Sequence, residues 1–316
     1  MKEIGGYLEL DKYRLPLLHK DAIALNCGRN ALAYLIETNS IKSIWFPKYM
    51  CDSCDSILKD HRVKINYYSI DFNFTPKDLS AKSSDWIYVV NFFGQLTREY
   101  ILHLKNVYQN IILDNTQAYF FEPIKGLDTI YSCRKYFGVP DGAFLYTNKE
   151  WDAEIEVDVS YKRMNYLLGR FELSANMFYN EYVSNNDLFK NEPIKIMSKL
   201  TSNLLCGVDY KYVEDRRTKN FCYLHNKFVN INKLKLTVPN GAFMYPLLIK
   251  NGANVRTELQ KRKIYIPTLW PEVLAKCDIN ELEYDFAKNI LPLPVDQRYG
   301  IDDMEYIYNE VYKCID

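Results

Sequence analysis

Lys135 stands where two strand-like runs of the sequence meet a tight turn. Residues 128–132 form one strand-like run before it, and residues 143–147 form a second run after it. The residues between the lysine and the second run, 138–142, are rich in glycine and proline, which is typical of a turn. Most lysines are solvated charges, but an amine held beside such a turn can also be placed to react. Lys135 alone does not separate these two interpretations.

A carboxylate and a hydroxyl are expected near this amine. Asp114 follows the expected strand 110–113 and Ser132 ends the strand 128–132, and ligands of open α/β sheets bind beyond such carboxyl ends. Taken singly, an Asp or a Ser at a strand end more often satisfies a local turn. With Lys135, and with the glycine turn Gly28-Arg29-Asn30 at the start of the first expected helix, the set suits pyridoxal phosphate (PLP). The aldehyde of PLP needs a lysine, its pyridine nitrogen needs a carboxylate, and its phosphate needs hydroxyls and free N–H groups.

The first half of the chain alternates between strand-like and helix-like segments. Continuous apolar runs such as WIYVVNFF (86–93) are typical of strands that are buried on both faces. The alternation predicts an α/β protein with a mostly parallel sheet covered by helices. The expected strands are 43–46, 63–70, 86–93, 110–113, 128–132 and 143–147, and the expected helices are 28–37, 52–60 and 96–107.

The second half has a different character. Residues 161–232 are predicted to be largely helical, and strand-like pieces (241–249 and 263–266) then alternate with helices (255–262 and 301–315). The last helix has apolar residues at alternating spacings of three and four, which predicts one apolar face. We place a domain boundary near residue 200. The prediction is a large cofactor-binding domain over residues 1–200 and a smaller C-terminal α+β domain over residues 201–316.

The composition argues against several classes of partner. Basic and acidic residues balance at 40 each, so net charge gives no reason to expect a nucleic acid or a membrane surface as partner. The N-terminal segment lacks the apolar stretch of a signal peptide, and no run approaches the roughly 18 residues of a membrane helix. We therefore expect a cytoplasmic protein.

The cysteines and histidines do not indicate a metal site. The eight cysteines are scattered without framework spacing and are expected to be reduced. Cys51 and Cys54 form a C-x-x-C motif, but a zinc ribbon would need a second pair. A redox pair is one interpretation, and two buried or helix-lining thiols are the interpretation that we favour. The four histidines are widely spaced, so no metal is expected.

Six stretches of the chain resemble, in order, the PLP-dependent sugar aminotransferases of the DegT/StrS type. The resemblance implies the aspartate-aminotransferase fold (fold type I), with a sheet of the seven-stranded type in the large domain. It says more about fold and cofactor than about substrate. The stretches are LNCGRNALAYL (25–35), IWFPKYMCDS (44–53), VVNFFGQ (89–95), LDNTQAYF (113–120), YSCRKYFGVPDGAFLYT (131–147) and ILPLPVDQRYGIDDMEYI (290–307).

The resemblance assigns catalytic roles to Lys135 and Asp114. Lys135 would bind PLP covalently as a Schiff base and later move the substrate proton. Asp114 would pair with the pyridinium nitrogen, and Gln117, in a D-x-x-Q pattern, would bond to the phenolic oxygen of the ring.

The phosphate of PLP would be held by Ser132 and by backbone amides at Arg29 and Asn30. Gly28 precedes these amides and would let them approach the phosphate closely. The family usually has a small hydroxyl residue at the position of Arg29, whose guanidinium could pair with the phosphate or point away.

The family also stacks an aromatic side chain on the cofactor ring. That position falls on Cys51 in this chain, and Tyr49 lies two residues earlier. Either residue would cover the ring, and Tyr49 is slightly preferred.

The implied reaction is a transamination. An amino-acid donor, by resemblance glutamate, would give its amino group to a keto-sugar, by resemblance linked to a nucleotide, on a route to a surface polysaccharide. Family members build the active site across a homodimer, and the aromatic-rich middle of this chain would suit such an interface. One alternative is a PLP-dependent sugar dehydratase, in which a histidine replaces the lysine. Another is a non-catalytic binding or regulatory protein that kept the fold.

A charged run on the expected middle helix was also considered as a substrate contact. Arg216, Arg217, Lys219 and Asn220 could touch an anionic group. Such a run is more often a solvated helix face, and this is the interpretation adopted.

Overall fold

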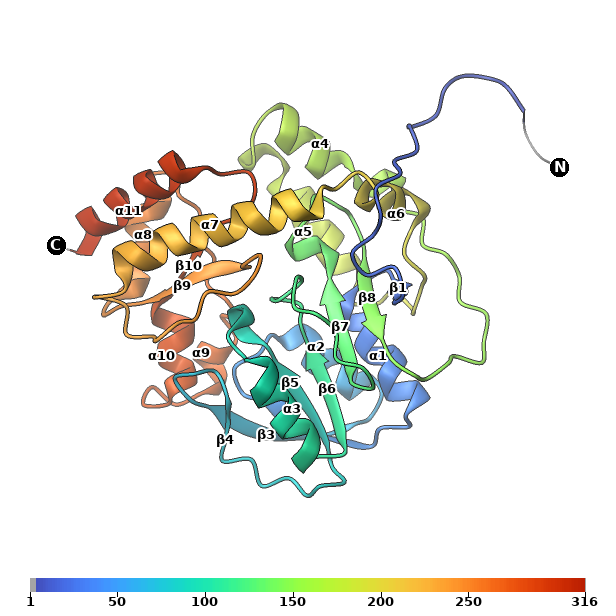
Figure 1. Cartoon of the computed structure of the whole chain (residues 1–316), viewed down its shortest axis with the longest axis horizontal. Helices are drawn as coiled ribbons and strands as arrows, with labels where there is room; N and C mark the ends of the chain where they lie inside the picture. The colour runs from blue at the N-terminus through green and yellow to red at the C-terminus, as the bar shows by residue number, and fades with distance from the viewer. Residues whose placement is uncertain (1–3, 316) are drawn as a thin grey trace.

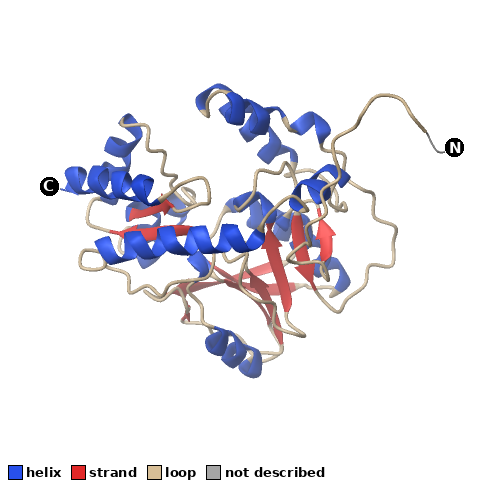
Figure 2. Cartoon of the chain, turned by 45° about the horizontal axis from the view of Figure 1, so that its top comes forward, coloured by secondary structure: helices blue, strands red, loops and turns tan. Residues whose placement is uncertain are grey.

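The computed structural model describes residues 4–315 as a large sheet with helices on both of its sides, beside a smaller second sheet (Figures 1 and 2). The strands are β1 (Ile23–Leu25), β2 (Ser43–Pro47), β3 (Lys64–Ile70), β4 (Pro76–Lys77), β5 (Trp86–Val90), β6 (Asn110–Asp114), β7 (Asp128–Ser132), β8 (Ala143–Tyr146), β9 (Met244–Leu248) and β10 (Ile290–Pro294). The α-helices are α1 (Gly28–Thr38), α2 (Asp52–Asp60), α3 (Arg98–Val107), α4 (Asn165–Glu172), α5 (Tyr179–Leu188), α6 (Lys199–Leu205), α7 (Tyr210–Phe228), α8 (Gly252–Lys261), α9 (Val273–Lys276), α10 (Leu282–Asn289) and α11 (Ile301–Ile315). Short 3₁₀ turns are η1 (Phe92–Gly94), η2 (Cys133–Lys135), η3 (Tyr161–Arg163) and η4 (Asn176–Phe178).

Most of the expected elements of the first half are confirmed to within a few residues. The expected strand 86–93 is shorter than predicted, because β5 ends at Val90 and the chain turns into η1. Phe93 has a φ of 54° and Gly94 a φ of 72°, and no strand admits these left-handed angles.

The expected strand 263–266 is wrong. Ile264 and Ile266 are buried and the residues beside them are exposed, so the alternation that predicted a strand is real. The segment nevertheless has no hydrogen-bonded neighbour in either sheet. Lys263 has a φ of 63° and Pro267 lacks an N–H, and both features interrupt a ladder.

The large sheet confirms the predicted mostly parallel arrangement. Its strand order is β1-β8-β7-β6-β5-β2-β3-β4. The five central strands, from β7 to β3 in this order, all run parallel to their neighbours within this group. β8 runs antiparallel to both β7 and β1. β4 has two residues and pairs antiparallel with β3. Without this short edge strand, the sheet has the seven strands that the resemblance implied.

The chain reverses its direction of travel across the sheet between β2 and β5. From β2 it moves outward to β3 through α2, and from β5 it moves the other way to β6 through α3. Since parallel crossovers are right-handed, the two helices must cover opposite faces, and Figure 1 shows α3 in front of the sheet and α2 behind it. A crevice for ligands is expected beyond the carboxyl ends of strands at such a reversal.

A second apolar cluster lies around β9 and β10. These strands pair antiparallel, and α7, α8 and α11 pack beside them (Figure 1). The long helix α7 contributes Val213 to the core of the large sheet and Phe221, Leu224 and Phe228 to the second cluster. The domain boundary near residue 200 stays a prediction.

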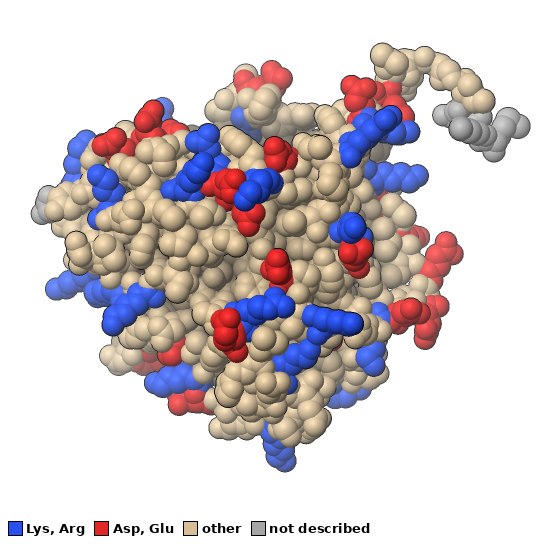
Figure 3. Space-filling model, in the orientation of Figure 1, with Lys and Arg blue, Asp and Glu red and all other residues tan. Residues whose placement is uncertain are grey.

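The surface agrees with the balanced composition. Basic and acidic side chains are interspersed over the face shown in Figure 3. Within residues 4–315, none of the helices combines the length and the apolar character needed to cross a membrane.

Gly252, at the start of α8, should resist substitution. A Cβ atom at this position would lie 2.1 Å from the backbone oxygen of Asn289, at the end of α10. Gly→Ala in an unobstructed helix stabilises by up to about 1 kcal/mol, whereas overpacking against backbone costs about 1–3 kcal/mol. We therefore expect Gly252→Ala to lower the free energy of unfolding in urea. Gly300→Ala is the control, because the nearest atom to its Cβ would be 3.5 Å away, and an equal effect of both substitutions would contradict the steric account.

Candidate active site

Lys135 ends the turn η2 directly after β7, and its side chain is exposed. Its Nζ donates a hydrogen bond to Oγ1 of Thr116 at 2.9 Å. The ring of Phe243, from the second half of the chain, lies 5.8 Å from the same nitrogen. The amine is thus accessible and is held at the carboxyl edge of the large sheet.

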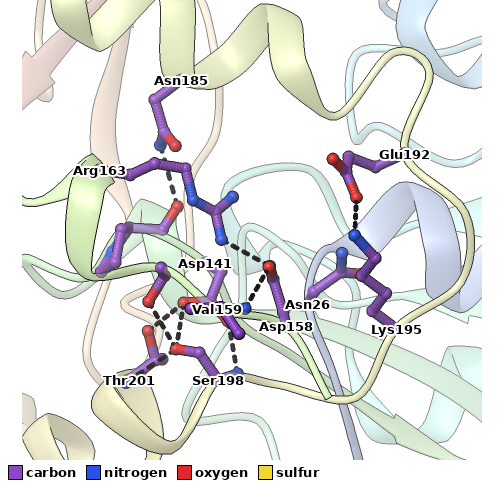
Figure 4. Close-up of polar contacts among 12 residues, drawn as sticks. Asn26, Asp141, Asp158, Val159, Arg163, Asn185, Glu192, Lys195, Ser198 and Thr201 are labelled. Atoms are coloured by element: carbon purple, nitrogen blue, oxygen red, sulfur yellow. Dashed lines mark hydrogen bonds and ion pairs between the residues drawn. The ribbon is translucent and has the colours of Figure 1, made fainter. Parts of the chain in front are cut away.

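The turn that carries Lys135 is tied to the rest of the large sheet. Gly142 has a φ of 117°, and a Cβ there would lie 3.3 Å from the sulfur of Cys133, so this position requires glycine. The buried carboxylate of Asp141 accepts hydrogen bonds from the amide and hydroxyl of Ser198, both at 2.8 Å, and from the hydroxyl of Thr201 (Figure 4). These contacts fasten the lysine turn to the first turn of α6.

Arg217 fastens the same turn to the second half of the chain. Its side chain is 2 % exposed, and its guanidinium donates to the backbone oxygens of Tyr136 (3.1 Å), Ala242 (3.0 Å) and Phe243 (3.3 Å). It also lies 4.5 Å from the ring centroid of Tyr136.

The interpretation of the charged run as a solvated face is therefore wrong for two of its members. Arg217 and Asn220 are buried, and the amide nitrogen of Asn220 donates to the backbone oxygens of Val295 and Tyr299. These two residues are three apart and share one face of α7, which turns toward the core. Both satisfy backbone groups rather than a substrate.

Asp114 ends β6 and is buried. One carboxylate oxygen accepts from the hydroxyl of Tyr88 at 2.8 Å, and the other accepts from the amide of Thr116 at 2.7 Å. Burial and the charge of Asp114 raise the pKa of Tyr88, so its hydroxyl stays protonated and donates. Thr116, which the sequence analysis did not select, thus contacts both Lys135 and Asp114.

Gln117 lies one residue further along and is also buried. Its side-chain oxygen accepts from the amide of Phe93 at 2.9 Å. This contact orients the side chain and leaves the amide nitrogen as the donor for another group.

The first turn of α1 lies beside Thr116. A Cβ on Gly28 would be 3.7 Å from the methyl group of Thr116. Cys27 precedes the helix without a side-chain hydrogen bond that caps it, and only its sulfur, a weak acceptor, faces the amides of Arg29 and Asn30. The first turn of α1 therefore keeps backbone N–H groups that can donate to an anion.

The side chains of Arg29 and Asn30 point elsewhere. Arg29 donates to the backbone oxygen of Asn186 at 3.2 Å, and buried Asn30 donates to Asn26 (2.8 Å) and to the backbone oxygen of Pro193 (2.7 Å). Only the backbone of these residues is placed as predicted, and the guanidinium of Arg29 takes the second of its two expected orientations. Ser132 is 9 % exposed, and its side chain makes no hydrogen bond that caps η2.

The two residues proposed to stack on a cofactor lie in different surroundings. Tyr49 has no exposed surface and packs against Trp270, Phe92 and Phe286, so its ring cannot lie against a bound ligand. The preference for Tyr49 is corrected on this ground. Cys51 keeps some exposed surface, and the charge of Lys135 helps to lower the pKa of its thiol.

The structure thus gathers Gly28, Cys51, Asp114, Thr116, Ser132 and Lys135 at one edge of the sheet. This edge is also where the chain reverses its direction across the sheet. Thr116 and Phe243 were missed, and Arg217 was misinterpreted, because their roles depend on contacts between residues that are far apart in the sequence. In the described part of the chain, no three His, Cys, Asp or Glu side chains are placed to hold a metal ion.

Neither family models nor curated proteins match the sequence. Solved structures do match the fold. A DegT DnrJ EryC1 StrS aminotransferase from Brucella abortus has a TM-score of 0.63 at 14% identity, over 92% of this chain and 85% of that one. The putative sugar aminotransferase Spr1654 from Streptococcus pneumoniae, in its PMP form, has a TM-score of 0.65 at 13% identity, over 94% and 89% of the two chains.

A third similar structure has a different activity. The E. coli GDP-4-keto-6-deoxy-D-mannose-3-dehydratase has a TM-score of 0.62 at 14% identity, over 92% of this chain and 87% of that chain. The chain therefore has the α/β fold that sugar aminotransferases of the DegT/StrS type share with this dehydratase.

Replacing Arg217 should disturb the lysine turn more than replacing its neighbour. Arg217→Met removes the guanidinium donors to the oxygens of Tyr136, Ala242 and Phe243. Tyr136 keeps a bond from Gln297, and a buried acceptor that is left unpaired costs about 1–3 kcal/mol. We expect a lower melting temperature and a larger urea sensitivity. Arg216→Met is the matched control, because Arg216 makes an exposed 3.4 Å hydrogen bond with the hydroxyl of Tyr212 and lies over the ring of the same residue. Equal stability of the two variants would show that the Arg217 contacts do not contribute to the stability of the fold.

Proposed function

We propose that this chain is a PLP-dependent aminotransferase that transfers an amino group from an amino-acid donor to a keto-sugar. The observation that carries the proposal is the exposed amine of Lys135, joined through Thr116 to the buried carboxylate of Asp114. The fold of known sugar aminotransferases supports it. Glutamate as donor, a nucleotide-linked sugar as acceptor and a place in polysaccharide synthesis are parts of the same proposal.

The residues at this edge of the sheet fit PLP. The first turn of α1, which no side chain caps, and the hydroxyl of Ser132, which caps no turn, suit a phosphate. Each oxygen of Asp114 has one protein partner, which leaves lone pairs for a pyridinium N–H. The free amide nitrogen of Gln117 suits a phenolate oxygen. In this proposal the sulfur of Cys51, on which the charge of Lys135 acts, would lie against the pyridine in place of an aromatic ring.

The side chains have distinct tasks in the reaction. PLP, when bound, withdraws electrons from the substrate's α-carbon and so makes its proton acidic. Asp114, oriented by Tyr88, would keep the pyridine nitrogen of PLP protonated, and the withdrawal of electrons depends on that proton. Thr116 holds the free Lys135 amine at 2.9 Å, where it can accept the α-proton and return it elsewhere.

A sugar dehydratase is the second candidate, because one similar structure has that activity. The lysine favours transamination over it. An amine at position 135 both binds an aldehyde covalently and carries a proton between two carbons, and these two tasks define a transaminase.

Exposed apolar side chains support a homodimer. Leu168, Phe171, Met177 and Tyr179 on and around α4 and α5 are all more than half exposed. Contiguous exposed apolar surface of this kind marks protein interfaces. Dimerisation and a cytoplasmic location remain predictions.

Lys135→Ala should abolish covalent cofactor binding. Purified protein mixed with PLP should turn yellow, and borohydride reduction followed by peptide mapping should place the cofactor on Lys135. The alanine variant should yield no adduct at this position, whereas Lys48→Ala, which removes a lysine already paired with Glu281 at 2.6 Å, should label like the unmodified chain. A colourless protein that takes up no PLP would favour the non-catalytic alternative.

Asp114→Asn should separate binding from catalysis. An amide cannot hold the pyridinium proton, so conversion of bound PLP by glutamate should slow by roughly 10²-fold or more while the cofactor still binds. Loss of the yellow colour on adding donors, measured in a stopped-flow instrument, reports this step. Asp128→Asn, at the opposite end of β7, is the control and should react at the normal rate. If no amino donor bleaches the unmodified protein, the cofactor assignment survives and the transaminase assignment fails.

A further inference from the structure

Cys51 and Cys54 occupy the turn between β2 and α2. These elements and β3 form a parallel βαβ unit, with the C-x-x-C motif at the point where the helix begins. The sequence analysis favoured two inert thiols here, and the structure provides several reasons to change that interpretation.

The two sulfurs face each other across the first turn of α2. Cys51 is the residue that precedes the helix, and Cys54 is the third residue within it, with its amide 3.3 Å from the oxygen of Cys51. The thiols share a hydrogen bond, and the hydroxyl of Ser53 lies 2.8 Å from the sulfur of Cys51. Cys51 retains exposed surface, whereas Cys54 is buried at 8 % exposure. Cys51 is therefore the more accessible residue of the pair.

The surrounding charges favour a thiolate at Cys51. The hydrogen bond from Cys54, with smaller contributions from Ser53 and the charge of Lys135, lowers the pKa of Cys51 to about 6 against the effect of burial. The hydrogen bond to Cys51, together with burial, raises the pKa of Cys54.

The nearby carboxylates do not cancel this arrangement. Asp52 and Asp55, in the first turn of α2, both pair with Lys276 of α9, the latter at 2.6 Å. Asp114 of β6 acts on Cys54 and raises its pKa.

We propose that Cys51 and Cys54 form a thiol–disulfide exchange site that reacts with small-molecule disulfides of the glutathione type. Cys51 is the attacking sulfur and Cys54 is the resolving sulfur. The exchange is proposed for the chain without bound PLP, because PLP attached to Lys135 would cover the sulfur of Cys51.

The exchange is balanced without any further reagent. The Cys51 thiolate attacks one sulfur of the small disulfide, so that a mixed disulfide forms and the first thiolate leaves. Cys54 then gives up its proton and attacks the sulfur of Cys51, which forms the Cys51–Cys54 bond and releases the second thiolate. The two cysteines lose two electrons, the small disulfide gains them, and the two protons end on the released thiols.

Cys277 provides an internal comparison. It is also partly exposed, but burial and its hydrogen bond to Glu281 raise its pKa to about 12. Near neutral pH, the larger thiolate fraction of Cys51 outweighs the weaker nucleophilicity of a low-pKa thiol. The two effects together predict attack at Cys51 that is on the order of 10²-fold faster than at Cys277.

The test uses the reduced, folded full-length chain, without added PLP, mixed with oxidised glutathione. Peptide mass mapping should find a Cys51–Cys54 disulfide and two released glutathione thiols per chain. Cys54→Ser should stop at a glutathione adduct on Cys51, and Cys51→Ser should form neither product. Melting curves test whether both variants are folded. If either variant is unfolded, the modification of Cys51 is compared between the native and the urea-unfolded unmodified chain instead.

Two results would overturn the proposal. In the first, Cys51 stays unmodified in the native chain, or reacts no faster than Cys277, under conditions that oxidise the unfolded chain. In the second, the unmodified chain and Cys54→Ser both stop at the mixed disulfide, which would show that Cys54 does not resolve it. Neither result bears on the PLP assignment, because the assay reads only sulfur chemistry.

Discussion

The guanidinium of Arg217 is the contact on which the geometry of the site depends most. It is one of the largest fully buried side chains, and it donates to backbone oxygens on both sides of the crevice. On one side is Tyr136, next to the lysine, and on the other are Ala242 and Phe243, next to β9. A buried arginine is tolerated only when its donors are satisfied, so the burial of Arg217 and its bonds to these distant segments of the chain require each other. The position of the Lys135 amine therefore depends on the bonds of Arg217 as well as on the strand β7 that precedes the lysine.

The crevice itself follows from strand order. Five parallel strands bring the ends of β2, β5, β6 and β7 to one edge, and the reversal between β2 and β5 leaves that edge uncovered by a crossover. Asp114 and Lys135 follow β6 and β7, whereas Cys51 follows β2 on the other side of the reversal. Residues from both halves of the sheet therefore meet there without a long loop.

Local patterns predicted the elements of the first half well. Buried strands such as β5 and β6 are continuous apolar runs, and the turn after β7 is marked by Gly138, Pro140 and Gly142, so their signals are short-range. The order of Asp114, Ser132 and Lys135 along those strands was enough to expect them at one edge. The expected strand 263–266 failed because alternation reports burial and not the presence of a partner to pair with.

The residues that were missed or misplaced depend on distant contacts. Thr116 matters because Lys135, 19 residues later, reaches it. Arg217 was taken for a solvated charge because its acceptors lie 25 and 81 residues away in the sequence. Tyr49 was preferred over Cys51 for its chemistry, but Trp270 and Phe286 arrive from the other end of the chain to enclose its ring. No window of local sequence contains this information.

The length of α7 and its position between the two apolar clusters have a structural consequence. At 19 residues it is a rod of about 28 Å, with α11 packed along it and with its buried arginine bonded to both walls of the crevice. A rod fixed in this way tilts as a unit rather than bending. Because one helix serves both apolar clusters, the orientation of the second cluster relative to the large sheet is fixed by the same side chain that anchors the backbone beside Lys135.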